Sequence, residues 1–217
     1  MPKATRAGQG IALSPERFLE ALIQAPPVVA ALMRLQFYIG LRMEESIASK
    51  DSLKSWLNIL KNGGSDLTVS GGTKGGKIRA VYIHKVNREA VFIAIAGALA
   101  ATENAKSHFY PDAKNDRSAK TKYGQDLAAL GLKKEASSHA MRRAFAVEDL
   151  LGYLQEGFNA KSALARVSQN LGHGDGRGRW VWNCYVKNSI RAEILDLLSG
   201  DTSMRLFASV ESRRLAA

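Results

Sequence analysis

Cysteine is almost absent from this sequence, because Cys184 is the only one in 217 residues. A single cysteine excludes an internal disulfide framework. Without a second thiol the chain also has no zinc site built from several thiolates. The shortage favours a reducing compartment.

Long hydrophobic runs are missing as well. The longest run, Ala90 to Ala101, falls short of the roughly 20 residues that a membrane-spanning helix needs. The opening Met1-Pro2-Lys3 does not begin a secretory signal. We therefore expect a soluble, intracellular protein.

Acidic residues are scarce relative to basic ones. The chain has 31 Lys and Arg against 20 Asp and Glu, a formal net charge of +11 at pH 7. A basic excess favours a polyanionic partner such as nucleic acid. A soluble protein that simply happens to be basic has the same charge, so the excess indicates a class of partner and not a reaction.

Apolar residues are plentiful, at 46% of the chain, which is enough for one buried core. A helix is predicted from Ser14 to the Pro26-Pro27 break, and helical spacing of apolar residues predicts seven more, over 28–39, 44–60, 88–101, 120–130, 138–155, 162–171 and 190–198. Short β-rich runs at 67–69 and 78–83 flank a glycine-rich tip and predict a hairpin. The polar stretch 110–121 is expected to be a surface loop. The predicted fold is therefore mainly α with a small antiparallel β-sheet (α+β).

The glycine-rich tip, Gly71 to Lys77, fits the first part of a phosphate-binding GxxxxGK loop. The fit then fails, because Ile78 replaces the Ser or Thr that would bind magnesium and a strand follows where a helix is required. A basic β-turn of this kind can instead place a lysine beside a phosphodiester.

Three further short patterns carry possible chemistry. His139 and Arg142 lie three apart at a helix start and share one face, while His173 and Arg42 each follow the glycine that ends an apolar helix. Each pattern also has a structural explanation. His139 and Arg142 could form a surface pair or a capping interaction, His173 could be a hydrogen-bonded core histidine, and Arg42 could neutralise the end of its helix. Taken singly, none of them indicates a function.

Taken in order, these patterns and a following tyrosine closely resemble the tyrosine recombinases of the phage-integrase family. The matching stretches are GLRMEE, TKGGKIRAVYI, SSHAMRRAFA and NLGH, and the resemblance spans roughly 28–190. It implies a recombinase catalytic domain over 14–200, preceded by a flexible lead-in (1–13) and followed by a tail (201–217). The tail is expected to dock on a neighbouring protomer or to pack on its own core.

The resemblance also implies roles for individual residues. Arg42 and Arg142 would clamp the phosphate, Lys74 would protonate the departing 5′ oxygen, and Tyr185 would be the nucleophile. His139 would assist proton transfer at the tyrosine, and His173 would hydrogen-bond a phosphate oxygen. The supporting or DNA-contacting residues would be Glu45, Arg143, Arg177 and Arg179.

The implied reaction cleaves and rejoins DNA through a 3′-phosphotyrosine, which preserves the energy of the broken bond. It needs no ATP, metal or other cofactor. The expected partners are double-stranded DNA and further copies of the chain, as a dimer or tetramer in the synapse. The expected location is the prokaryotic cytoplasm, at nucleoid DNA.

Two departures from the family pattern leave alternatives open. The gap from His173 to Tyr185 is a few residues longer than usual, and the usual position of the tyrosine holds Trp182. Tyr185 is the only tyrosine after His173, with Cys184 beside it as an improbable substitute, so a catalytically inactive DNA-binding relative is an alternative. The segment before Ser14 is too short for the family's N-terminal DNA-clamping domain. The chain is therefore expected to be a fragment or to resemble short members such as the fimbrial phase-variation invertases.

Two further enzyme classes are disfavoured. Type IB topoisomerases share the tyrosine chemistry but commonly have lysine where His139 stands. A metallohydrolase is less favoured still, because the four histidines show no HExxH or similar spacing.

Overall fold

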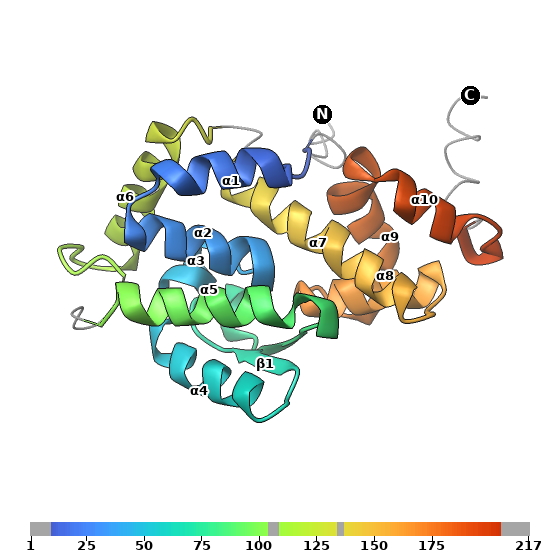
Figure 1. Cartoon of the computed structure of the whole chain (residues 1–217), viewed down its shortest axis with the longest axis horizontal. Coiled ribbons are helices and arrows are strands. Elements are labelled where there is room, and N and C mark those ends of the chain that lie inside the picture. The colour runs from blue at the N-terminus through green and yellow to red at the C-terminus, as the bar shows by residue number, and fades with distance from the viewer. Residues whose placement is uncertain (1–9, 104–108, 134–136, 205–217) are drawn as a thin grey trace.

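A computed structural model describes residues 10–103, 109–133 and 137–204. Its helices are α1 (Pro15–Gln24), α2 (Pro27–Ile39), α3 (Met43–Ile47), α4 (Lys50–Lys61), α5 (Arg88–Ala101), α6 (Asp116–Ala129), α7 (Ser138–Gln155), α8 (Ala160–Asn170), α9 (Gly178–Val181) and α10 (Ala192–Leu198) (Figure 1). Strands β1 (Asp66–Val69) and β2 (Arg79–Tyr82) form an antiparallel pair. The predicted fold class, mainly α with a small antiparallel sheet, is confirmed.

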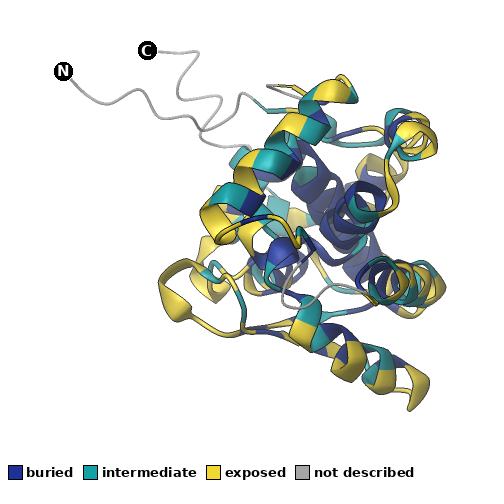
Figure 2. Cartoon of the chain, turned by 90° about the vertical axis from the view of Figure 1, so that its left-hand side faces the viewer, coloured by how far each residue is buried: buried dark blue, intermediate teal, exposed yellow. Residues whose placement is uncertain are grey.

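Helix α2 lies at the centre of the core and packs against both α5 and α7. Its apolar side chains, including Leu32, Leu35 and Ile39, are fully buried. Figure 2 shows the buried residues gathered on the central helices, with exposed residues on the outer faces. Gly40 ends α2 in the left-handed conformation (φ +66°), and a Cβ there would lie 2.3 Å from a ring carbon of Phe145. Only glycine fits this turn, which directs the chain toward Arg42.

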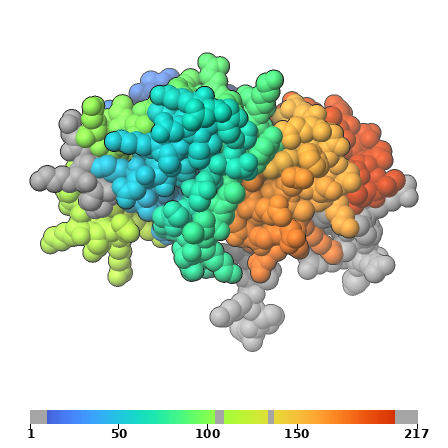
Figure 3. Space-filling model, turned by 90° about the horizontal axis from the view of Figure 1, so that it is seen from below, coloured from blue at the N-terminus to red at the C-terminus, as the bar shows by residue number. Residues whose placement is uncertain are grey.

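The hairpin formed by β1 and β2 packs against two helices. Leu67 pairs with Val81 and Val69 with Arg79, β1 packs against α4, and β2 packs against α8. In Figure 3 the hairpin (teal) accordingly lies beside the α8 region (orange). The predicted hairpin is confirmed, and it brings the residues of β2 next to the end of α8.

Two predicted elements differ from the structure. The helix expected over 44–60 is divided into α3 and α4, where the Ser46 and Ser49 hydroxyls donate to the carbonyls of Met43 and Ser46, both at 2.8 Å. Such local bonds compete with the helical pattern. The loop expected over 110–121 includes the start of α6, because Asn115 caps the helix by accepting from the Ser118 amide at 2.9 Å.

The ends of the described part contact the domain. Within the predicted lead-in, the Ala12 amide donates to Ser189 Oγ at 2.7 Å, and Leu13 is buried. Within the predicted tail, Asp201 accepts from the Ala160 amide at 2.6 Å, at the start of α8. Residues 1–9 and 205–217 lie outside the described residues. Among the helices that the structure describes, none is long and apolar enough to span a bilayer.

Candidate active site

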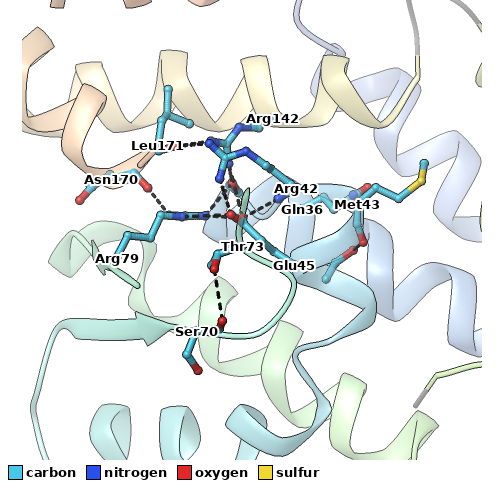
Figure 4. Close-up of polar contacts among 12 residues, drawn as sticks. Gln36, Arg42, Met43, Glu45, Ser70, Thr73, Arg79, Arg142, Asn170 and Leu171 are labelled. Carbon is cyan, nitrogen blue, oxygen red and sulfur yellow. Dashed lines mark hydrogen bonds and ion pairs between the residues drawn. The ribbon is translucent and has the colours of Figure 1, made fainter. Parts of the chain in front are cut away.

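Three arginines from different elements converge on Glu45 (Figure 4). Arg42 precedes α3 and pairs with Glu45 through Nη1. Arg79 Nη2 on β2 lies 2.7 Å from Glu45 Oε2, and Arg142 Nη1 on α7 lies 3.8 Å from the same oxygen. We call Arg42, Arg79, Arg142 and Glu45 the arginine cluster. Three positive charges face one negative charge, so the cluster carries an excess of two positive charges (3 − 1).

Backbone carbonyls at the ends of two helices also hold the arginines. The Gly40 carbonyl after α2 accepts from Arg79 at 3.3 Å and from Arg142. The Leu171 carbonyl after α8 accepts from Arg42 at 3.1 Å and from Arg142. Helix C-termini carry partial negative charge and favour cations. The Gly40 and Leu171 carbonyls therefore orient the guanidinium groups but do not neutralise the full positive charges of the arginines.

Burial and charge together keep this cluster ionised. Burial alone would raise the pKa of Glu45, but the charges of Arg79 and Arg142 and a hydrogen bond from Arg79 lower it to about 2. Burial, reinforced by the neighbouring charge of Arg79, lowers the pKa of Arg142 to about 10. Both groups therefore remain charged at neutral pH, and the excess positive charge persists.

Tyr185 lies in a π-helical turn, Trp182–Val186, that follows α9. Its side chain is mostly shielded from solvent, and its phenol oxygen lies 3.4 Å from His173 Nε2. The Trp180 ring packs edge-on against both, with centroids 4.5 Å from His173 and 5.5 Å from Tyr185. Arg143 donates from Nε to the Cys184 carbonyl at 3.3 Å and so helps to hold the turn that carries the tyrosine.

His173 is placed by the end of α8. Gly172 adopts φ +71°, and a Cβ there would lie 2.7 Å from Arg79 Cδ, so glycine is required where the chain turns. Burial, followed by the charges of Arg142 and Arg42, lowers the pKa of His173 to about 4. The ring is therefore neutral at pH 7 and has a lone pair available to accept a proton.

His139 differs from His173 in its surroundings. It lies in the first turn of α7, is exposed, and its side chain makes no hydrogen bond with any other described residue. Partial desolvation, followed by the charges of Arg143 and Arg142, lowers its pKa. Of the two predicted imidazoles, only His173 contacts the tyrosine in this structure.

The remaining predicted cations are on the surface. Lys74 begins the short turn at the hairpin tip, is exposed, and has no hydrogen bond or ion pair within the described part of the chain. Arg177 and Arg179 are exposed on the segment between α8 and the tyrosine. The structure thus brings Arg42 and Arg142 together with Glu45, His173 and Tyr185 but leaves Lys74 without a contact to them.

The family is shown by comparison with known proteins. The family described as "Integrase" matches residues 1–148, more than half of the chain. The chain belongs to this integrase family. This confirms the resemblance to tyrosine recombinases and phage integrases that the sequence motifs carry.

Two solved structures are similar to this chain. The XerA recombinase has a TM-score of 0.49 at 16% identity, with 86% of this chain and 63% of that chain covered. The XerH site-specific recombinase, in a post-cleavage complex with a palindromic difH substrate, has a TM-score of 0.48 at 22% identity, with 79% and 49% covered. The integrase therefore spans less than two thirds of either chain. Among curated proteins, none matches it significantly in sequence.

The structure adds Arg79 to the residues that the sequence motifs single out in this chain. Its side chain is buried and shares Glu45 with the predicted arginines. The available signal was strand alternation, because Arg79 has the same parity as the apolar Val81 and Ile83 and so faces inward. A charge at an inward position of a strand requires a buried partner.

Cys184, the substitute nucleophile considered above, lies beside Tyr185 in the π-helical turn. Burial raises the pKa of the Cys184 thiol, which reduces the thiolate that nucleophilic attack requires. Within residues 10–103, 109–133 and 137–204, no group of three or more His, Cys, Asp or Glu side chains is placed to hold a metal ion.

Proposed function

We propose that this integrase is a tyrosine site-specific recombinase that cleaves and rejoins double-stranded DNA, with 14–200 as its catalytic domain. The observation that carries the proposal is the excess positive charge of the arginine cluster beside the Tyr185–His173 pair. A phosphodiester is a monoanion with two non-bridging oxygens, which planar guanidinium groups bind in a fixed geometry. Stabilisation of the charge that grows in the transition state is usually the largest catalytic contribution.

In the proposed step, the Tyr185 oxygen attacks the phosphorus and the bond from phosphorus to the 5′ oxygen breaks. The phenol proton passes to Nε2 of the neutral His173, and the 5′ oxygen takes a proton from Lys74. The DNA remains attached as a 3′-phosphotyrosine until a 5′ hydroxyl attacks it in the reverse sense. The reaction consumes no ATP and involves no metal.

Arg42 and Arg142 are proposed to bind the non-bridging oxygens. Arg142 Nε is buried and has no hydrogen-bond partner among the described residues, so it has a donor to spare. An unsatisfied buried donor is costly, and a phosphate oxygen would relieve that cost. The 3.4 Å contact favours His173 over His139 as the proton acceptor. The assistance expected from His139 and the hydrogen bond expected from His173 to a phosphate oxygen both stay predictions.

Lys74 requires movement to act. It is exposed on the hairpin tip beside Gly75 and Gly76, which adopt φ +69° and +68°. Glycines in the left-handed region leave the backbone of the tip conformationally free. We propose that bound DNA draws the lysine toward the 5′ oxygen.

Double-stranded DNA is the proposed partner. Arg177 and Arg179 would contact its backbone, which positions DNA without reading its sequence. Two or four copies would assemble on the DNA. Because residues 201–204 contact α8 of the same chain, the predicted docking on a neighbouring protomer is proposed for the remainder of the tail. The proposed setting is nucleoid DNA in the prokaryotic cytoplasm.

The test uses nicked or half-site DNA from the ends of the element that encodes the protein. A covalent protein–DNA adduct on a denaturing gel is expected for the native chain and for Cys184→Ala, but not for Tyr185→Phe. DNA binding without an adduct would instead identify a non-catalytic relative of the family. Relaxation of supercoiled DNA without strand exchange would identify a topoisomerase-like activity.

A further inference from the structure

A second cluster of buried polar groups adjoins the arginine cluster through Arg79. In this cluster, which we call the Asn170 anchor, Asn170 at the end of α8 bonds to Asp149 and Tyr153 on α7 and to Tyr82 on β2. Asn170 Nδ2 donates to both Asp149 carboxylate oxygens, at 3.0 and 2.9 Å, and to the Tyr153 oxygen at 3.1 Å. Its Oδ1 accepts from the Tyr82 amide at 3.1 Å. One amide side chain thus ties the end of α8 to α7 and β2.

The same short segment supplies the acceptors for all three arginines. The Asn170 carbonyl accepts from Arg79, and the Leu171 carbonyl accepts from Arg142 and, at 3.1 Å, from Arg42. Both carbonyls belong to the segment that the Asn170 side chain anchors. Figure 4 shows Asn170 and Leu171 side by side above Arg79 and against Arg142. A shift of this segment would therefore move one hydrogen-bond acceptor of every guanidinium group in the cluster.

His84 completes the anchor from the other side. Its Nε2 lies 3.0 Å from Asp149 Oδ1 and its Nδ1 lies 2.8 Å from Glu156 Oε1, while the Tyr82 and Tyr153 rings pack against it. Only a protonated imidazole donates to two carboxylates at once. The positive charge of the imidazolium compensates the negative charge of the buried Asp149 carboxylate. The two hydrogen bonds from the neutral Asn170 amide would not neutralise that charge.

We infer that Asp149 and Asn170, backed by His84, are positioning residues that set the arginine cluster for the scissile phosphate. The inference rests on the proposed DNA-cleavage function. A buried polar pair costs desolvation, and apolar side chains of similar size often stabilise a core equally well. The role that we infer for the anchor is therefore to hold the guanidinium groups in position. A displacement of these groups by about 1 Å would lower the cleavage rate by on the order of 100-fold.

The test compares two DNA substrates that differ at one atom of the scissile linkage. A methylphosphonate replaces a charged non-bridging oxygen with a methyl group, so the arginines have no charge there to stabilise. The variant is Asn170→Leu, and Gln169→Leu, the exposed neighbour on the same helix, is the matched control. Adduct formation is followed in single turnover, with DNA affinity measured in parallel.

We expect Asn170→Leu to lower the phosphodiester rate by about 10- to 100-fold. The methylphosphonate rate and the DNA affinity should change by less than about threefold, and Gln169→Leu should resemble the native chain. An equal loss on both substrates would show a merely structural role and overturn the inference, as would full activity of the variant. If Asn170→Leu does not fold, Asp149→Leu combined with Asn170→Leu replaces both partners by apolar groups and takes its place.

A measurement without DNA separates this inference from the proposed function. In ¹⁵N-arginine NMR spectra, guanidinium groups held by carbonyls give separate Nη–H signals, because rotation about the terminal C–N bonds is hindered. Asn170→Leu should shift the signals of Arg79 and Arg142, because the Asn170 and Leu171 carbonyls move while Glu45 and the Gly40 carbonyl remain, and Gln169→Leu should leave them in place. Unshifted signals in Asn170→Leu would overturn the inference even if no form of the protein cleaves DNA.

Discussion

The Nε2 atom of His173 lies 3.4 Å from the phenol oxygen of Tyr185, although twelve positions separate the two residues in the chain. The intervening segment forms short helical turns and ends in the π-helical turn that carries the tyrosine. A π-turn adds a residue to the helical repeat and often occurs at functional sites. The unusually long gap in the sequence is thus compatible with a histidine–tyrosine contact.

The histidines should titrate very differently in the DNA-free protein. His173, with a pKa of about 4, should stay neutral as the pH is lowered to about 5.5. Burial alone would lower the pKa of His84, but hydrogen bonds and the charges of Asp149 and Glu156 raise it. His84 should therefore still be protonated above about pH 6.5, the usual pKa of histidine. Imidazole ¹⁵N chemical shifts measured against pH test this ordering. A His173 that titrates near about 6.5 would show that burial and the charges of Arg142 and Arg42 do not lower its pKa.

The same shifts predict opposite linkages to stability. Because the pKa of His173 is lowered on folding, its contribution is present above about pH 6.5 and is lost as the pH falls toward 4. Because the pKa of His84 is raised, its contribution is present below about pH 6.5 and is lost as the pH rises through the folded value. Urea unfolding of His84→Gln and the native chain from pH 5 to 9 checks the second sign: the difference should shrink at high pH.

Glu45→Gln should destabilise the fold by about 3–5 kcal/mol, because it leaves buried Arg79 and Arg142 without their counter-charge. The matched control is Glu44→Gln, next in the same helix, which loses only an exposed pair with Lys120 and should cost less than about 1 kcal/mol. Denaturant midpoints monitored by circular dichroism measure both. Equal effects would mean that the arginine cluster does not depend on Glu45.

Lys74→Ala should leave stability unchanged, because the side chain is exposed, and should slow cleavage by about 10²- to 10⁴-fold. A substrate with sulfur in place of the bridging 5′ oxygen supplies a leaving group that needs no proton, so it should restore the rate. Lys77→Ala, on the same hairpin, is the control and should affect DNA affinity alone. A defect that the sulfur substrate does not repair would remove Lys74 from the acid role.

Gly40→Ala should be more destabilising than Gly75→Ala. Both glycines have φ near +66° to +69°, so each substitution carries about 1–2 kcal/mol of backbone strain. A Cβ at Gly40 also meets the Phe145 ring, whereas one at Gly75 meets nothing within 4 Å. Thermal unfolding of the two variants therefore isolates the steric contribution, and equal melting temperatures would show that the core at Phe145 adjusts.

Removing Arg177 and Arg179 together should weaken DNA binding and reduce its salt dependence. Each lost phosphate contact lowers the slope of log K against log salt concentration by about 0.9. Lys54→Ala, an exposed cation on α4, is the control. Titrations between low and moderate salt measure the slopes, and an unchanged slope in the double variant would place the DNA elsewhere.

Much of the fold was predictable from local pattern. The α5 and α7 bounds follow from apolar spacing and agree with the predicted 88–101 and 138–155. The predicted helix 44–60 was wrong as a single helix, because apolar spacing continues across the place where the hydroxyls of Ser46 and Ser49 divert the backbone. Periodicity reports which residues face the core and does not report where local hydrogen bonds interrupt a helix.

By itself, the sequence determined the family, the helices and hairpin, and the order of the motif residues from Arg42 to Tyr185, because these depend on local spacing along the chain. The tertiary structure alone decided that Arg79 shares Glu45, that Asn170 bonds to Asp149, and that His173 is the imidazole beside the tyrosine. The physical reason is distance along the chain. Each of these contacts joins separate elements, and its geometry is set by how those elements pack.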